Sequence, residues 1–170
     1  VNAARAAKKL SGMRVGIIGE AFRGMGDFAV PYSELAARFG IDAFDVPDHE
    51  LLQYYNSVST AEIEEEKTAN EKRFAFDGEI IEEEYNENIK ACLAVRKYIE
   101  QKRLSAFSVN FLNFDRDGFP LKSMPFLEAC MAMERGIGYA GEGDGLTAAF
   151  TAALLSAYPE TYGLPSDCSS

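Results

Sequence analysis

Short, almost continuous apolar runs alternate along this chain with longer stretches in which apolar residues recur at helical spacing. The run at 13–19 is bounded by glycines, and similar runs lie at 41–46, 106–111 and 137–140. A short continuous run is typical of a strand that is buried on both faces of a parallel sheet. The pattern therefore predicts four strands.

The intervening stretches predict helices. The longest is expected over 79–103, where Ile81, Tyr85 and Ile89 begin a series of apolar residues at helical spacing. Further helices are predicted at 1–9, 32–39, 60–73, 126–134 and 146–157, and another begins at Pro47-Asp48. Thr60 is the predicted N-cap of the helix at 60–73.

The alternation of strands and helices favours an α/β fold of the Rossmann-like or flavodoxin-like kind. We expect a three-layer sandwich in which a mostly parallel sheet is flanked by helices on both faces. The length fits one α/β domain, 1–170. Ligands of such sheets bind at the carboxyl ends of the strands, so the loops 20–27, 111–117 and 141–144 are the candidate positions of a site.

The charge balance narrows the classes of partner. The chain has 27 acidic and 17 basic residues, and its net charge is −10. We therefore expect no binding to nucleic acid or to an anionic membrane surface, because both require a basic face. No apolar run approaches the ~20 residues of a membrane span. The sequence also shows no signal-peptide pattern, which indicates a cytoplasmic protein.

Cysteine and histidine offer little chemistry in this sequence. Cys92, Cys130 and Cys168 are far apart and have no Cys-x-x-Cys spacing, which argues against a disulfide framework or a zinc knuckle. Cys92 and Cys130 fall within apolar helical patterns and are expected to be small buried residues. His49, at a predicted helix start, is expected on the surface.

The segment 136–149 holds the strongest candidate chemistry. Glu142 and Asp144 stand among five glycines, just before a predicted helix. Glycines permit sharp turns, carboxylate oxygens bind hard divalent ions, and a carboxylate can act as a base beside a carbonyl group. The alternative is that both acids only favour the N-terminus of the helix.

The glycine-rich segment 19–27 also follows a predicted strand, as nucleotide-binding loops do. It is not a Gly-x-Gly-x-x-Gly sequence, and it lacks the Lys-Ser/Thr pair of a phosphate-binding loop. Arg23 is its one cation. Nucleotide binding by this segment is therefore disfavoured.

The sequence Gly-Tyr-Ala-Gly-Glu-Gly-Asp at 138–144, followed by Leu-Thr-Ala-Ala, resembles the glycine–glutamate loop of the L-arabinose isomerase and L-fucose isomerase superfamily. Segments 39–40, 55–59, 97–101 and 106–107 follow in the order of the central domain of L-arabinose isomerases. The resemblance implies the central domain of an enzyme that interconverts an aldose and a ketose. Such enzymes move a proton between adjacent carbons through an enediol, helped by Mn²⁺.

The resemblance also implies roles for individual residues. Glu142 would be a metal ligand and one of the acid/base carboxylates, and Asp144 would orient the substrate or its neighbouring ligand. Phe22 and Phe111, each after a strand, would line the sugar pocket, with ordinary packing as the alternative for both. Members of the family assemble as oligomers whose sites are completed between subunits, so a homo-oligomer is expected.

Two departures from the family pattern modify these expectations. L-arabinose isomerases carry Trp-Lys after Gly-Glu-Gly-Asp, whereas Gly145-Leu146 stands here, which favours a related sugar. The other metal ligands of the family belong to a C-terminal domain, and no histidine follows Asp144. With Val1 and the tail 158–170, this indicates a piece excised from a longer isomerase and inactive alone. The alternative function is a sugar-binding or sensing module without catalysis.

Overall fold

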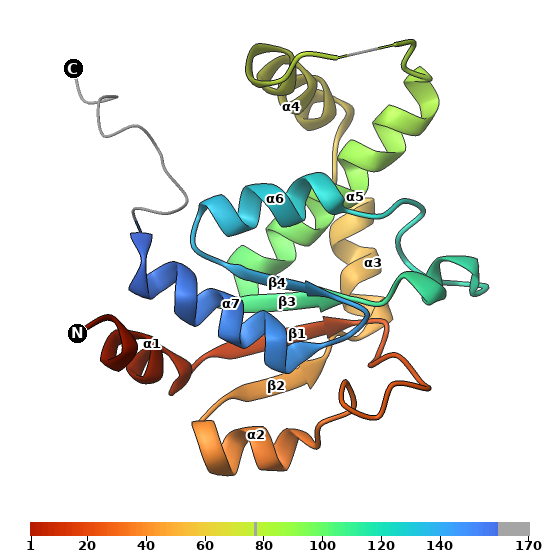
Figure 1. The fold of residues 1–170 in the computed structure, drawn as a ribbon. Coiled ribbons are helices and arrows are strands. Elements are labelled where there is room, and N and C mark those ends of the chain that lie inside the picture. Colours follow the sequence, from red (N-terminus) through yellow and green to blue (C-terminus); the bar gives the residue numbers. More distant parts are fainter. Residues whose placement is uncertain (77, 160–170) are drawn as a thin grey trace.

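The predicted strands pair into one parallel sheet in the order β2-β1-β3-β4 (Figure 1). The strands are β1 (Arg14–Ile18), β2 (Asp42–Asp45), β3 (Ala106–Val109) and β4 (Gly138–Gly141). The structure, a computed structural model, describes residues 1–76 and 78–159. Its register places Val15 beside Ala43 on one side and Ala106 on the other. The expected α/β fold with a parallel sheet is confirmed.

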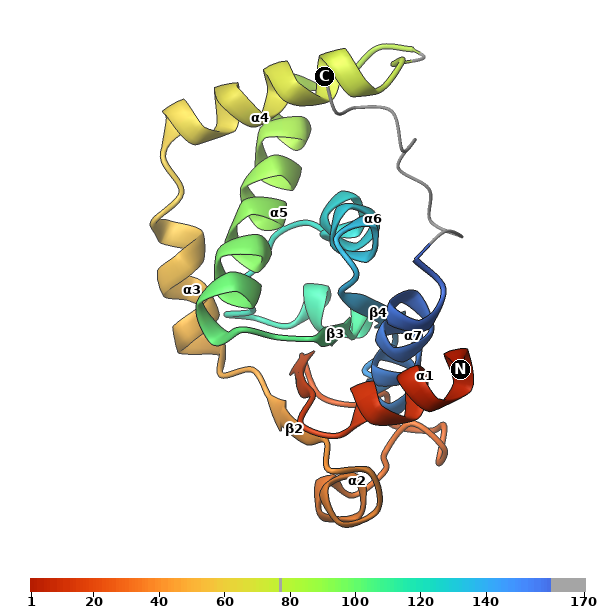
Figure 2. The same ribbon diagram turned by 90° about the vertical axis from the view of Figure 1, so that its left-hand side faces the viewer.

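Helices flank both faces of this sheet. They are α1 (Asn2–Leu10), α2 (Tyr32–Phe39), α3 (Asp48–Asn56), α4 (Thr60–Arg73), α5 (Glu82–Lys102), α6 (Phe126–Glu134) and α7 (Gly145–Ala157), and a 3-10 helix spans Phe111–Asp115. Helices α1 and α7 pack together on one face, and α3 and α6 pack against α5 on the other. Helix α4 lies across the end of α5 that is far from the sheet (Figure 2). Among the described helices, none is both long and apolar enough to cross a membrane.

Two apolar cores form because alternate residues of a strand point to opposite faces of the sheet. Val15 and Ile17 of β1 pack with buried residues of α7 in one core. Ile18 of the same strand packs with Val109 and the buried face of α5 in the other. Both faces are thus covered, which explains why the strands appear in the sequence as continuous apolar runs.

Helix α7 approaches β4 closely because both elements present small residues. Ala148 and Ala152 are completely buried. A Cβ atom built on Gly138 would lie 2.1 Å from the carbonyl oxygen of Ala148 and 2.5 Å from the nitrogen of Ala152. The contact between this helix and the sheet therefore requires glycine at position 138, and it lets the middle of α7 pack directly on the start of β4.

The predicted N-cap of α4 is wrong by one residue. Ser59 rather than Thr60 caps the helix, and its side-chain oxygen accepts a hydrogen bond from the N–H of Glu62 at 3.3 Å. The carboxylate of Glu62 in turn accepts from the N–H of Ser59 at 2.8 Å. This reciprocal capping box requires an acid three residues after the cap, a spacing that Ser59 has and Thr60 lacks.

The predicted strand at 106–111 is too long at its carboxyl end. β3 ends at Val109 because the side chain of Asn110 accepts from the N–H of Leu112 at 3.1 Å and caps the 3-10 helix.

The expectation that Cys130 is buried is wrong. Cys130 is exposed on α6, whereas Cys92 is buried as expected. His49 is exposed, also as expected. Cys168 lies outside the described residues.

Candidate functional site

The loops expected to carry the site meet at the carboxyl edge of the sheet, where β1, β3 and β4 are neighbours. The side-chain amide of Asn110, after β3, donates to the carbonyl oxygen of Glu20, after β1, at 3.3 Å. The backbone N–H of Phe22 donates to the carbonyl oxygen of Glu142, after β4, at 2.9 Å. Segments that are far apart in the sequence are thereby joined into one surface.

Glu142 has an uncommon backbone conformation directly after β4. Its φ is 62°, in the left-handed region, which costs a residue with a side chain about 1–2 kcal/mol. The turn is held by a hydrogen bond from the N–H of Glu142 to the carbonyl oxygen of Val109, at 2.9 Å. Backbone strain of this kind concentrates at functional sites, and it supports Glu142 as the candidate carboxylate of this edge.

Gly143 allows the loop after β4 to contact the loop after β1. Its φ is 78°, and a Cβ atom at this position would lie 2.3 Å from the carbonyl oxygen of Glu20 and 2.5 Å from the Cα atom of Ala21. No larger residue could occupy the position without moving one of the loops. The glycines of this segment therefore bring the Glu142 backbone against the neighbouring loop.

Asp144 has a clear structural role. It is the N-cap of α7, and its side-chain oxygen Oδ1 accepts from the N–H of Thr147 at 2.8 Å. This is the helix-terminus role that the sequence left open as an alternative. The part expected for Asp144 in orienting a substrate stays a prediction. The cap commits one of its two carboxylate oxygens to the helix.

Phe22 and Phe111 lie together, although their separation in the sequence gives no sign of it. Their ring centroids are 6.1 Å apart, with an angle of 40° between the rings. Phe22 is half-buried and Phe111 is 45% exposed. The two rings form an apolar surface, and the backbone of Phe22 is bonded to that of Glu142; the expected contact of the rings with a sugar stays a prediction.

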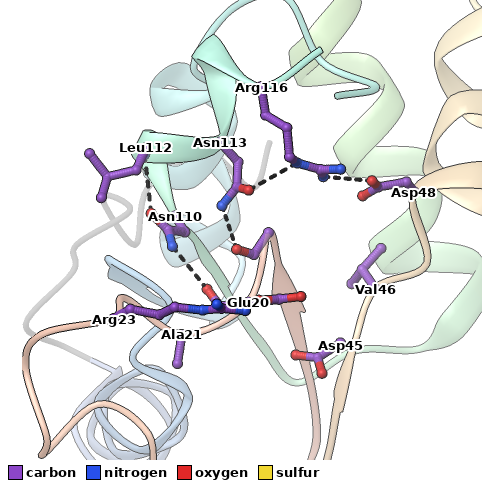
Figure 3. A pocket seen from close by; sticks show the side chains of 11 residues that line it. Glu20, Ala21, Arg23, Asp45, Val46, Asp48, Asn110, Leu112, Asn113 and Arg116 are labelled. Carbon is purple, nitrogen blue, oxygen red and sulfur yellow. Dashed lines mark hydrogen bonds and ion pairs between the residues drawn. The ribbon is translucent and has the colours of Figure 1, made fainter. Parts of the chain in front are cut away.

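Sequence reasoning predicted a site in the loops 20–27 and 111–117, but it did not single out most of the polar residues that line a cavity there. The cavity has a volume of about 510 Å³ and lies at the ends of β2, β1 and β3 (Figure 3). We call it the carboxyl-edge cavity, and its polar lining includes Glu20, Arg23, Asp45, Asn110, Asn113 and Arg116. A signal was present in the sequence, because two asparagines follow the buried strand β3. The described residues that line the cavity do not include Glu142, Asp144, Phe22 or Phe111.

The residues that the structure describes do not gather a complete metal site. No group of three or more histidine, cysteine, aspartate or glutamate side chains lies close enough to hold an ion within residues 1–76 and 78–159. Glu142 offers hard carboxylate oxygens of the kind that Mn²⁺ prefers. This chain therefore fits a divalent ion as the source of one ligand, and further ligands would have to come from other residues.

Comparisons with known proteins show which family this chain resembles. A family model described as "L-arabinose isomerase central domain" matches residues 32–158. The chain is 33% identical over 128 residues to the L-arabinose isomerase of Leuconostoc mesenteroides subsp. mesenteroides, covering 71% of this chain and 26% of that protein. It is 31% identical over 123 residues to L-arabinose isomerase 2 of Bacillus licheniformis, covering 68% of this chain and 25% of that protein.

A third relative, the L-arabinose isomerase of Pediococcus pentosaceus, is 32% identical over 124 residues, covering 68% of this chain and 25% of that protein. The chain thus spans about a quarter of the length of the curated relatives that it matches. The matched region contains β2, β3, β4 and the Glu142 loop. The chain belongs to the L-arabinose isomerase family and matches the central domain of that family.

Proposed function

We propose that this chain is the central domain of a divalent-metal-dependent aldose–ketose isomerase, and that Glu142 is its metal-binding and acid/base carboxylate. The observation that carries the proposal is the left-handed backbone of Glu142, after a parallel strand, in a segment that matches the family. Strained backbone positions cluster at functional sites, although Glu20 and Arg103 also have a positive φ, so the family match at Glu142 is the second support. A carboxylate at the carboxyl end of a strand suits such a purpose.

The chemistry requires a proton to move between two adjacent carbons of a sugar. The Glu142 carboxylate can act as the general base for such a transfer, and it can return the proton to the neighbouring carbon. Phe22 and Phe111, whose rings lie together, would supply an apolar surface that excludes water from one side of the sugar. A bound divalent ion would supply polarisation of the carbonyl and hydroxyl oxygens of the substrate.

The proposal assigns only part of an active site to this chain. Glu142 would provide one ligand, and the remaining ligands would come from other parts of a longer protein or from a neighbouring subunit of a homo-oligomer. The isolated chain should therefore bind metal weakly and show no turnover. L-arabinose is the first sugar to test because the relatives carry its name, and the Gly145-Leu146 pair makes related aldoses the next.

The test is Mn²⁺-dependent aldose–ketose conversion by the longer parent protein, screened over L-arabinose, L-fucose and other pentoses and hexoses. Turnover that a chelator abolishes is expected. Glu142→Gln should reduce it by at least about a hundredfold, within the range for loss of general acid–base catalysis. Glu134→Gln, at the partly exposed end of α6, is the matched control and should keep turnover.

Two outcomes of this experiment would count against the proposal. Wild-type turnover in Glu142→Gln would remove Glu142 from the reaction. Absence of turnover on every sugar, with sugar binding still detectable by calorimetry, would make the protein a sugar-binding or sensing module instead.

A further inference from the structure

The carboxyl-edge cavity lies where the direction of strand succession reverses in the sheet. The chain passes from β1 to β2 on one side, and then crosses back to β3 on the other side of β1. Parallel α/β sheets bind ligands at this switch point, because the loops after the two central strands diverge there and leave a crevice. At about 510 Å³, the cavity has the size of a small-molecule site.

Two ion pairs account for most of the charge that lines the cavity. Arg23 pairs with Glu20 at 3.0 Å, and Arg116 pairs with Asp48 at 2.6 Å. Asp45 adds a third carboxylate at the end of β2. Because acids outnumber the cations that line it, the cavity has no positive excess to hold a phosphate or another anion. A neutral ligand fits this balance better.

Hydrogen bonds hold the polar side chains of the cavity in place (Figure 3). The amide group of Asn113 donates to the carbonyl oxygen of Gly19 at 2.5 Å, and its own oxygen accepts from Nε of Arg116 at 3.1 Å. Arg116 is thus fixed between Asn113 and Asp48, with its guanidinium toward the cavity edge. The wall therefore presents both acceptors, the carboxylates of Asp45 and Glu20, and a donor, the guanidinium of Arg116, which suits hydroxyl groups because each hydroxyl both donates and accepts.

A second hollow, of about 370 Å³, continues the cavity past Glu20, Arg23 and Asp45, which line both. Its other wall is apolar and includes Phe28 and Tyr32. The hydroxyl of Tyr32 donates to the carboxylate of Asp45 at 2.5 Å and joins the two walls. A sugar has hydroxyl groups along its edges and apolar C–H faces, so one wall would bind the hydroxyls and the other would contact a face.

We propose that the carboxyl-edge cavity binds a neutral polyhydroxylated ligand, a sugar or sugar alcohol, at a site separate from Glu142. The carboxylates of Asp45 and Glu20 accept from ligand hydroxyls, and Arg116 donates to them. The proposal goes beyond the isomerase function and does not depend on it, because the lining residues are all supplied by this chain and no metal is required.

The test is isothermal titration calorimetry of the 170-residue chain, in the presence of a chelator, with L-arabinitol and L-arabinose as probes. Saturable binding is expected. Arg116→Gln and Asp45→Asn should each weaken it about ten- to a hundredfold, the loss of a hydrogen bond to a charged group. Arg38→Gln is the matched control, because Arg38 forms an exposed ion pair on α2 outside the cavity, and its affinity should equal that of the wild type.

Circular dichroism of each variant shows whether it folds. If Arg116→Gln does not fold, the more conservative Asp45→Asn alone tests the cavity. Three results would overturn the proposal. These are the absence of saturable binding of either polyol, binding that both cavity variants leave unchanged, or inorganic phosphate that binds more tightly than the polyols. Loss of binding in Glu142→Gln would place the ligand at the Glu142 loop and refute a separate site. Because metal-dependent turnover is measured apart from this binding, the two proposals can fail independently.

Discussion

The backbone N–H of Phe22 donates to the carbonyl oxygen of Glu142 at 2.9 Å. This bond joins the loop after β1 to the loop after β4, although β3 lies between the two strands in the sheet. It holds the Glu142 backbone against the segment that also lines the carboxyl-edge cavity. The position of the candidate carboxylate is therefore set by contacts between loops as well as by its own strand.

Replacement of Gly143 by alanine should disrupt this junction. The added Cβ atom would lie 2.3 Å from the carbonyl oxygen of Glu20, and the residue would keep a φ of 78°. Overpacking and the left-handed backbone together should lower the free energy of unfolding by about 2–4 kcal/mol. Urea denaturation of the chain measures this change.

Gly141→Ala is the matched control for Gly143→Ala. No atom lies within 4 Å of the Cβ position at Gly141, and its φ is not positive. The variant should stay within about 0.5 kcal/mol of the wild type. Equal effects of the two substitutions would show that the loops do not depend on their close approach at Gly143.

Replacement of Glu142 by glycine should leave stability unchanged or raise it by up to about 1 kcal/mol, because glycine adopts a φ of 62° without strain. Ala140→Gly in the preceding strand β4, where φ is not positive, should instead lower the free energy of unfolding by about 0.5–1 kcal/mol. Thermal unfolding of both variants makes the comparison. A larger loss in Glu142→Gly than in Ala140→Gly would show that the Glu142 side chain itself stabilises the loop.

Glu128 should be the most costly acid to remove from α6. Its side chain is completely buried, accepts from Nε of Arg96 at 2.7 Å and also pairs with Arg135. Glu128→Ala leaves these cations without their shared partner and should lower the free energy of unfolding by about 3–5 kcal/mol. Glu134→Ala, which removes a more exposed pair with Arg73 from the same helix, should cost less than about 1 kcal/mol. Chemical denaturation in which both variants lost the same stability would contradict the assigned burial.

Glu62 should contribute stability that depends on pH. A hydrogen bond from Lys97, followed by those from the backbone and hydroxyl of Ser59, lowers the pKa of Glu62 from 4.5 to about 2. Because the folded pKa lies below the unfolded value, the contribution is complete above pH 4.5 and is lost as the pH falls through about 2. Glu62→Gln removes this contribution, so its difference in stability from the wild type should shrink over that range.

Denaturant titrations at several pH values measure the difference for Glu62→Gln. The side chain is 38% exposed, so the effect should be small and should weaken in high salt. Glu65→Gln, an exposed acid on the same helix without an ion pair among the described residues, is the control. A difference for Glu62→Gln that stayed constant down to the lowest pH would rule out the lowered pKa.

Much of the fold could be predicted because local chemistry and long-range packing favour the same structure. Continuous apolar runs such as Val15–Ile18 must be buried on both sides, which requires a parallel sheet between two layers of helices. Gly40 adopts the left-handed backbone that ends α2, as its position in the sequence suggests. The spacing of Ser59 and Glu62 in the sequence also matches the capping box of α4, although Thr60 was predicted as the N-cap instead of Ser59.

The sequence by itself determined which residues offer chemistry, and the tertiary structure decided which of them lie together. Glu142, with its neighbouring glycines, could be singled out as a candidate because few segments combine a carboxylate with such turns, and its role in a site stays a prediction. By contrast, Asn113 and Arg116 meet Asp48 and Gly19 only at the edge of the sheet. The order of the strands in the sheet brings these residues together, and their separation along the chain does not predict the contact. For the same reason only the structure showed that a cavity lies between the predicted loops 20–27 and 111–117, whereas the capping of α7 by Asp144 is a local contact that the sequence already offered as an alternative.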